Sequence, residues 1–183
     1  MNARMFRRLG GVATIVTVAA SAVALTFAPA SAAPNDAAAA RQGTAQYHDS
    51  SRITTNSDWF QLYDLQNITC IDNPAGGMGI HFVNGGRVGD AVLNASQPEA
   101  VIYEPQKNGR LRLVALEYVV LKSVWEDAGN SEPPSLYGHE FEFVAEGNRY
   151  GLPDFYELHA WIWKHNPSGM HDDWNPNVSC QYA

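Results

Sequence analysis

The stretch EAVIYEPQKNGRLRLVALEYVV, residues 99–120, decides the fold. Two runs with strand-like composition, 100–104 and 110–120, flank a loop that contains Asn108-Gly109. An Asn-Gly pair between two such runs is the strongest short-range signal for a β-hairpin. We therefore expect a hairpin in which Asn108 and Gly109 are the two central turn residues.

The expected turn determines which side chains share a face of this hairpin. With a two-residue turn, Glu104 faces Leu113, and Glu117 lies on the same face as Ala100 and Glu104. Both faces of the hairpin are largely apolar, which is typical of strands that are covered on both sides. The hairpin is therefore expected to be central in its sheet.

Weaker patterns predict the elements that surround the hairpin. We expect further strands at 78–83, 140–144 and 155–163. Helical segments are expected at 37–48 and 123–128, with a short helical or irregular piece around 58–63 and no regular structure at 72–77. The predicted fold class is α+β, with an N-terminal helix packed on an antiparallel, partly barrel-like sheet.

The N-terminus has the three parts of a secretory signal peptide. Basic residues precede an uncharged stretch at 12–28, and Ala30-Ser31-Ala32 forms a site for cleavage after Ala32. We predict a signal peptide at 1–32 and a secreted or extracytoplasmic protein. An uncleaved membrane anchor fits less well, because the stretch is rich in Ala, Thr and Ser. Arg7-Arg8 leaves open the general and the twin-arginine export routes.

Composition and net charge limit the classes of partner that are expected for the remaining chain. We expect a disordered tail at 33–43 and a single globular domain at 44–183. Removing the signal peptide takes away three arginines and no acid, so the formal net charge changes from −7 to −10. So acidic a chain repels nucleic-acid phosphates and anionic membrane surfaces, and neither is an expected partner. A small molecule or a carbohydrate stays open as the ligand, and the sequence does not define the oligomeric state.

The chain has two cysteines, Cys70 and Cys180. In an oxidising compartment, two lone cysteines of one domain most simply pair with each other. Neither belongs to a CxxC motif or stands beside a histidine, which argues against a catalytic thiol. We predict a disulfide bond between Cys70 and Cys180 that ties the C-terminal tail to the middle of the domain.

Three ionisable side chains fall on segments that are expected to be buried strands: His81, Glu117 and His159. Two imidazoles and a carboxylate from neighbouring strands can hold Zn, Fe, Mn or Cu with an open coordination position. We predict a metal site here, with a divalent transition metal as the cofactor, and leave open hydrolytic or oxidative catalysis. The alternative is structural: each histidine binds a backbone carbonyl, and Glu117 pairs with Arg87 or Arg112.

Other ionisable residues fit such a site less well. Glu104 is too far from Glu117 along the hairpin for one metal to take both, and it is expected at the surface beside the turn. Asp172-Asp173 could bind a cation, but such a pair is more often a charged turn. The histidines in or near loops and helix ends are expected to be solvated: His48, His165 and His171.

An aromatic face in the last predicted strand supports a second class of function. Strict alternation puts Glu157, His159, Trp161 and Trp163 on one side of that strand. Aromatic rings bind sugars and other flat ligands, although core packing is their more frequent role. The alternative function is therefore a non-catalytic carbohydrate- or protein-binding module, with Trp161, Trp163 and Glu157 as its ligand-binding residues.

Several longer motifs occur together in this chain. They include GGMGIHFVN at 76–84, the hairpin stretch at 99–120 and LHAWIWKHNPSGM at 158–170. Together they resemble a family of uncharacterised secreted bacterial proteins of the actinobacterial type. The resemblance spans nearly all of the mature chain. It implies export and a single domain, and it implies no particular reaction.

Overall fold

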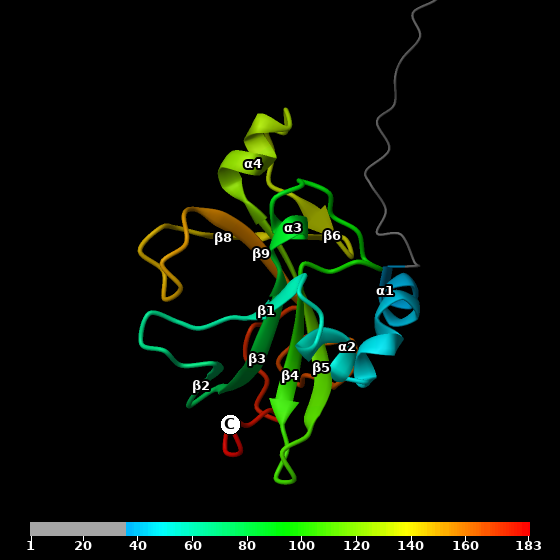
Figure 1. The fold of residues 1–183 in the computed structure, drawn as a ribbon. Helices are drawn as coiled ribbons and strands as arrows, with labels where there is room; N and C mark the ends of the chain where they lie inside the picture. The colour runs from blue at the N-terminus through cyan, green and yellow to red at the C-terminus, as the bar shows by residue number, and fades with distance from the viewer. Residues whose placement is uncertain (1–35) are drawn as a thin grey trace, which may run out of the picture.

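The hairpin of residues 99–120 forms the centre of an antiparallel sheet (Figure 1). The computed structural model describes residues 36–183. The strands of the main sheet, in the order β1-β3-β4-β5-β9-β8, are β1 (Trp59–Gln61), β3 (Gly76–Asn84), β4 (Ala100–Pro105), β5 (Leu111–Leu121), β9 (Phe155–Ala160) and β8 (Glu142–Val144). β2 (Cys70–Asn73) also pairs with β3, and β6 (Ser135–Leu136) with β7 (His139–Glu140) forms a separate ribbon.

Short helices complete an α+β fold, as predicted. They are α1 (Asp36–Thr44), a 3-10 helix (Ala45–His48), α2 (Ser51–Thr54), α3 (Gly85–Val88) and α4 (Lys122–Asp127). The N-terminal helices pack on one face of the sheet through Ala40, Tyr47 and Ile53, which belong to the main core. The sheet itself is open, with β1 and β2 at one edge and β8 at the other. No helix in the described part of the chain has the length and apolar character needed to cross a bilayer.

The N-terminal boundaries differ from the prediction. The predicted signal peptide, 1–32, lies outside the described residues. The predicted disordered tail, 33–43, is wrong from Asp36 onward, because α1 begins there. Two contacts order this segment: the Asp36 carboxylate accepts a hydrogen bond from the Tyr137 amide at 2.9 Å, and Ala40 is completely buried.

Other local predictions also need correction. The piece around 58–63 contains β1, because Trp59 is buried in the core and its strand pairs with β3. The segment 72–77 holds a tight turn between β2 and β3, in which Asn73 pairs with Gly76. The strand predicted at 140–144 is divided between β7 and β8. The last strand ends at Ala160 rather than at residue 163.

The register of the central hairpin also differs from the expected one. The Gln106 amide donates to the Arg110 carbonyl at 2.9 Å, so the loop has three residues and ends at Gly109 with a φ of 74°. This is the three-residue hairpin loop with a left-handed final residue. Glu104 therefore faces Arg112 instead of Leu113. A β-bulge then restores the expected register, so Glu117 still faces Ala100.

The C-terminal tail covers the face of the sheet opposite the N-terminal helices. Val178 and Trp161 pack there on Ile102 and Ala115, and Gly77 forms an isolated bridge with Asn175. The predicted disulfide between Cys70 and Cys180 is present, with the two Cα atoms 5.6 Å apart. The tail is therefore tied to the sheet both by packing and by a covalent bond.

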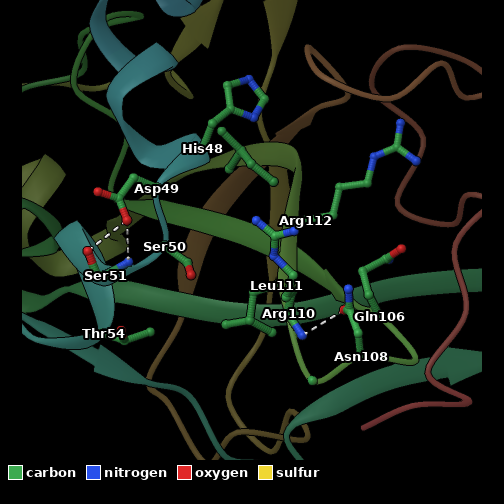
Figure 2. Close-up of a pocket in the computed structure, with 12 residues that line it drawn as sticks. His48, Asp49, Ser50, Ser51, Thr54, Gln106, Asn108, Arg110, Leu111 and Arg112 are labelled. Atoms are coloured by element: carbon green, nitrogen blue, oxygen red, sulfur yellow. Dashed lines mark hydrogen bonds between the residues drawn. The ribbon is translucent and has the colours of Figure 1, made fainter.

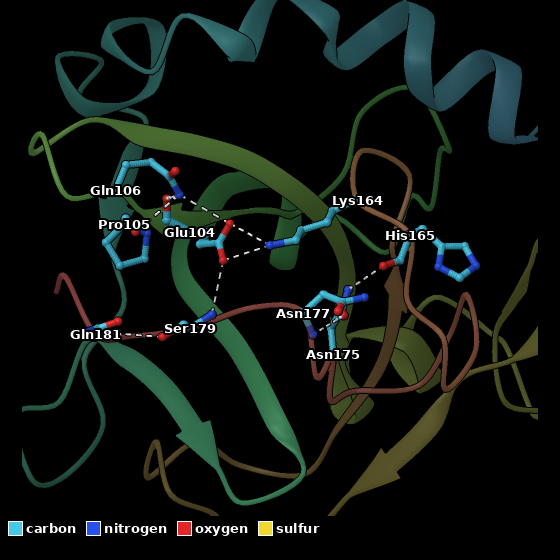
Figure 3. Close-up of polar contacts among 9 residues, drawn as sticks. All are labelled: Glu104, Pro105, Gln106, Lys164, His165, Asn175, Asn177, Ser179 and Gln181. Carbon is cyan, nitrogen blue, oxygen red and sulfur yellow. Dashed lines mark hydrogen bonds and ion pairs between the residues drawn. The ribbon is translucent and has the colours of Figure 1, made fainter.

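Glu104 anchors this tail, contrary to its expected exposure. Its carboxylate is 8% exposed and contacts Lys164 Nζ at 2.8 Å through both oxygens (Figure 3). The same carboxylate accepts a hydrogen bond from the Ser179 amide at 3.2 Å. Glu104 is thus a structural residue, away from the metal candidate.

Candidate metal centre

The structure brings His81, Glu117 and His159 together in the interior. His81 comes from β3, Glu117 from β5 and His159 from β9. All three are buried, and each offers a ligand atom within 4.8 Å of the others. The sequence-based expectation that these side chains converge is met, and their role as metal ligands remains a prediction.

Strand pairing explains how residues so far apart in sequence share a face. Glu117 lies directly opposite His159 on β9 and opposite Ala100 on β4. Ala100 in turn faces Val83, which lies two residues from His81 and therefore on the same side of β3. Glu117 and His81 are thus separated by one intervening strand, which amounts to about 10 Å between their backbones.

Small residues allow the side chains to meet across that strand. Ala100 is completely buried and has no atom beyond its Cβ, so it leaves room for His81 and Glu117 to approach above β4. Gly79, two residues before His81, has a φ of 106°, and a Cβ there would lie 2.7 Å from the Tyr103 carbonyl oxygen. Only glycine allows β3 to follow this path so close to β4.

The side-chain nitrogen and oxygen atoms of the cluster lie slightly farther apart than hydrogen-bonded atoms would. His81 Nε2 lies 3.6 Å from Glu117 Oε2, and His159 Nε2 lies 3.9 Å from Glu117 Oε1. The two imidazole rings are perpendicular, with their centroids 5.9 Å apart. Two atoms bound to one metal at about 2.1 Å lie at most about 4.2 Å apart, so side-chain adjustments of less than 1 Å would close the set around an ion.

Three of the four imidazole nitrogens in this cluster lack a well-directed hydrogen bond. Within residues 36–183, His81 Nε2 and both ring nitrogens of His159 are buried without a well-directed hydrogen bond. Buried polar groups are nearly always satisfied, and each exception calls for an explanation. The structural alternative, in which each histidine binds a backbone carbonyl, holds for one nitrogen of His81, which hydrogen-bonds the backbone of Gly79, but not for His159.

The arginines considered as partners of Glu117 lie elsewhere. Arg87 donates to the Pro98 carbonyl at 2.8 Å, and its guanidinium lies over the Trp59 ring. Arg112 is exposed beside the hairpin loop. Glu117 therefore faces two histidines, without either arginine to neutralise it.

Asp173, from the C-terminal tail, contacts the other side of His159. Its Oδ1 atom lies 3.2 Å from His159 Nδ1, so the ring stands between two carboxylates. The backbone carbonyl of His159 is itself 2.7 Å from Nδ1 of His171. A carboxylate behind a histidine is the arrangement that usually orients an imidazole ligand toward a metal. The charged turn expected at Asp172-Asp173 thus contributes one residue to the centre.

Burial and neighbouring charge shift the pKa values of the cluster in opposite directions. Burial lowers the pKa of His81, and Glu117 only partly opposes it. Burial also disfavours a charged His159, but Glu117, Asp173 and Glu157 together raise the pKa of that imidazole to about 9. For Glu157, burial and then the Glu117 carboxylate raise the pKa to about 9. The centre therefore combines a neutral imidazole with an imidazole and a carboxyl that hold protons.

A small pocket borders the centre at Glu117, although neither His81 nor His159 lines it. It has a volume of about 190 Å³, and Glu117 and Glu157 contribute to its wall. The rest of its lining is almost entirely apolar and comes from β1, α3, β5 and the segment before β9. Glu117 is thus the only one of the three candidate ligands that lines the pocket.

The aromatic residues predicted to bind ligand do not form one platform. Trp161 is buried against Ile102 and Val178, and its Nε1 donates to the Asp172 carbonyl. Trp163 packs on the opposite core and donates to Thr44 Oγ1 at 3.1 Å. Because β9 ends at Ala160, the alternation expected through residue 163 is broken. Glu157, the third of these residues, lies at the pocket wall beside Glu117.

A larger cleft lies elsewhere on the molecule, between the N-terminal helices and the hairpin loop (Figure 2). It measures about 1070 Å³ and includes exposed His48, Asp49 and Arg110. Asp49 accepts hydrogen bonds from the amide and hydroxyl of Ser51, so its polar groups are locally satisfied. We do not assign this cleft a role.

Comparisons with protein-family models, with curated proteins and with solved structures found no match for this chain. The sequence considered alone offers Asp172-Asp173 as a possible cation-binding pair but does not connect Asp173 with His159, and it gives no role to the pocket residue Tyr150. No local pattern marks Asp173, because its position depends on the path of an irregular tail.

Proposed function

We propose that the protein binds one divalent transition-metal ion through His81, Glu117 and His159. The observation that carries this proposal is the pair of buried imidazole nitrogens, His81 Nε2 and His159 Nε2, that face the Glu117 carboxylate without a hydrogen bond among the described residues. Imidazole and carboxylate ligands suit Zn, Fe, Mn and Cu. Asp173 would orient His159, as carboxylates behind ligating histidines usually do.

Three protein ligands leave a metal with an open position, which is typical of catalytic rather than structural sites. A metal bound in this way acts as a Lewis acid and lowers the pKa of a bound water. The apolar pocket beside Glu117 supports a role for the open position in binding a small molecule. Export of the protein is part of the proposal, and it is supported by the signal-like N-terminus and by the disulfide.

Metal titration of the full-length mature protein tests this proposal. After treatment with a chelator, calorimetry with Zn²⁺ should give one ion per chain, and His81→Ala or His159→Ala should abolish that binding. His165→Ala is the matched control, because His165 is exposed and away from the cluster. Circular dichroism and thiol titration would verify that each variant keeps its fold and its disulfide. Absent binding, or equal binding by wild type and His81→Ala, would overturn the proposal.

A further inference from the structure

The pocket beside the metal centre has a size that limits its occupant. Its volume is about 190 Å³. An apolar cavity of about 150 Å³ takes up benzene, so this pocket accommodates one six-membered ring with a short substituent. A disaccharide or a folded peptide segment does not fit in such a space.

The lining of the pocket selects for apolar character. Aromatic rings of Phe60, Tyr150 and Phe155 contribute to it, together with aliphatic side chains that include Val88 and Leu152. Phe60 is 50% exposed and places an apolar rim in contact with solvent. An apolar ring entering here removes its own surface and that of the rim from water.

The polar groups of the pocket are confined to one place. Among the described residues that line it, the only ionisable groups besides the Tyr150 phenol are the carboxyls of Glu117 and Glu157, and none of the lining residues is cationic. An anionic ligand would meet these two carboxyl groups directly, because the imidazole of His159 lies behind Glu117 and does not line the pocket. A neutral hydroxyl, by contrast, donates a hydrogen bond to a carboxylate oxygen.

Two loops hold the pocket in shape. Arg149, one residue before Tyr150, contacts the Asp64 carboxylate at 2.9 Å, and its carbonyl accepts a hydrogen bond from the Leu65 amide. Asp64 is buried and belongs to the segment after β1. The segment after β1 and the loop that precedes β9 lie side by side in Figure 1. The pocket wall is thus pre-formed rather than assembled by a ligand.

We propose that this pocket binds a neutral molecule with one ring and a hydroxyl group, such as a simple phenol, with the hydroxyl directed to Glu117 beside the metal. The inference deepens the proposed function, and it rests on that function for the position of the metal. The ring occupies the apolar part between Phe60 and Phe155. The hydroxyl lies at the end of the pocket formed by Glu117 and Glu157.

Binding of p-cresol to the full-length mature protein tests the proposal. Metal-free protein should bind p-cresol saturably in calorimetry, and Val88→Trp, which fills the pocket, should weaken that binding at least tenfold. Val92→Trp is the matched control, because Val92 is 61% exposed and does not line the pocket. Leu152→Trp provides a second pocket-filling variant from another element. Benzoate, of similar size but anionic, should not bind the metal-free protein.

Cobalt separates this inference from the proposed function. In Co²⁺-loaded protein, p-cresol should change the visible absorption of the metal, because its hydroxyl reaches the metal's open position. If Co²⁺ binds with the expected stoichiometry but p-cresol does not bind, this inference fails and the metal site stands. If p-cresol binds but Co²⁺ does not, the metal function fails, and with it the placement of the hydroxyl beside a metal. Equal p-cresol affinity in wild type and both pocket-filling variants would also overturn the inference.

Discussion

Asp173 and His159 are in contact at 3.2 Å, although one belongs to the irregular tail and the other to the last strand of the sheet. This contact lies on the side of the imidazole that faces away from Glu117, so Asp173 can orient the ring without being a ligand of the same ion. Burial raises the pKa of Asp173, but the neighbouring His159 outweighs that effect, and the pKa is lowered overall. The carboxylate is therefore charged at neutral pH.

Replacing Asp173 tests its orienting role. Asp173→Asn should weaken Zn²⁺ binding by about 10- to 100-fold, the usual effect of removing a carboxylate behind a ligating histidine. Asp172→Asn is the control, since its side chain serves only the Trp174 amide among the described residues. Calorimetry at fixed pH measures both. If the two variants bind Zn²⁺ equally, Asp173 has no orienting role.

Ala100 is the position where a larger side chain should close the metal site. Ala100→Val places two methyl groups between His81 and Glu117 and should lower Zn²⁺ affinity at least tenfold. Overpacking of this kind also costs about 1 to 3 kcal/mol of stability. Ala95→Val, at another buried alanine, should affect stability without affecting metal binding. Unchanged affinity in Ala100→Val would show that the ligands do not meet across β4.

Glu99 makes the stability of the fold depend on pH. Its side chain is buried, Oε1 has no partner among the described residues, and burial raises its pKa from 4.5 to about 8. The unfolded chain therefore holds fewer protons than the folded chain between these pH values. The contribution of Glu99 to the free energy of unfolding should therefore be most favourable below about pH 4.5. It should decrease progressively as pH rises toward 8.

Thermal unfolding of Glu99→Gln measures this effect. Glutamine keeps the shape and stays neutral, so the Tm advantage of Glu99→Gln over wild type should grow from pH 5 to pH 8. Each unit of pKa difference corresponds to about 1.4 kcal/mol, so the difference at pH 8 should amount to several degrees. Glu140→Gln, at an exposed position, should follow the wild-type curve. A constant Tm difference across this pH range would contradict the assignment.

The disulfide should contribute strongly to stability. It joins positions 110 residues apart, and in the chain-entropy model a loop of that size stabilises by about 4 to 5 kcal/mol. Urea unfolding of the double variant Cys70→Ser, Cys180→Ser measures the loss. Thiol titration of the unfolded, unreduced wild type should find no reactive thiol, and two per chain would refute the bond.

The sequence predicts those parts of the structure that depend on a short local motif or that allow only one possible pairing. Asn108-Gly109 locates the central hairpin, and two cysteines leave one intramolecular pairing. The loop length and the bulge are not predictable in this way, because both depend on how the hairpin packs against its neighbours. The convergence of His81 and His159 with Glu117 can be expected from buried strands, but confirming it needs the strand order. Asp173 is beyond prediction, since no periodicity describes the tail.

The wide spacing of the cluster along the chain has a consequence for folding. His81, Glu117, His159 and Asp173 come from β3, β5, β9 and the tail, and no two of them are neighbours within one strand. Contacts between such distant segments form slowly, because the loops between them must close first. Two elements complete the cluster, β9 and the tail, and both lie near the C-terminal end of the chain. A chain that lacks β9 and the tail therefore lacks the complete cluster, and the proposed ion could be bound only after these segments have joined the sheet.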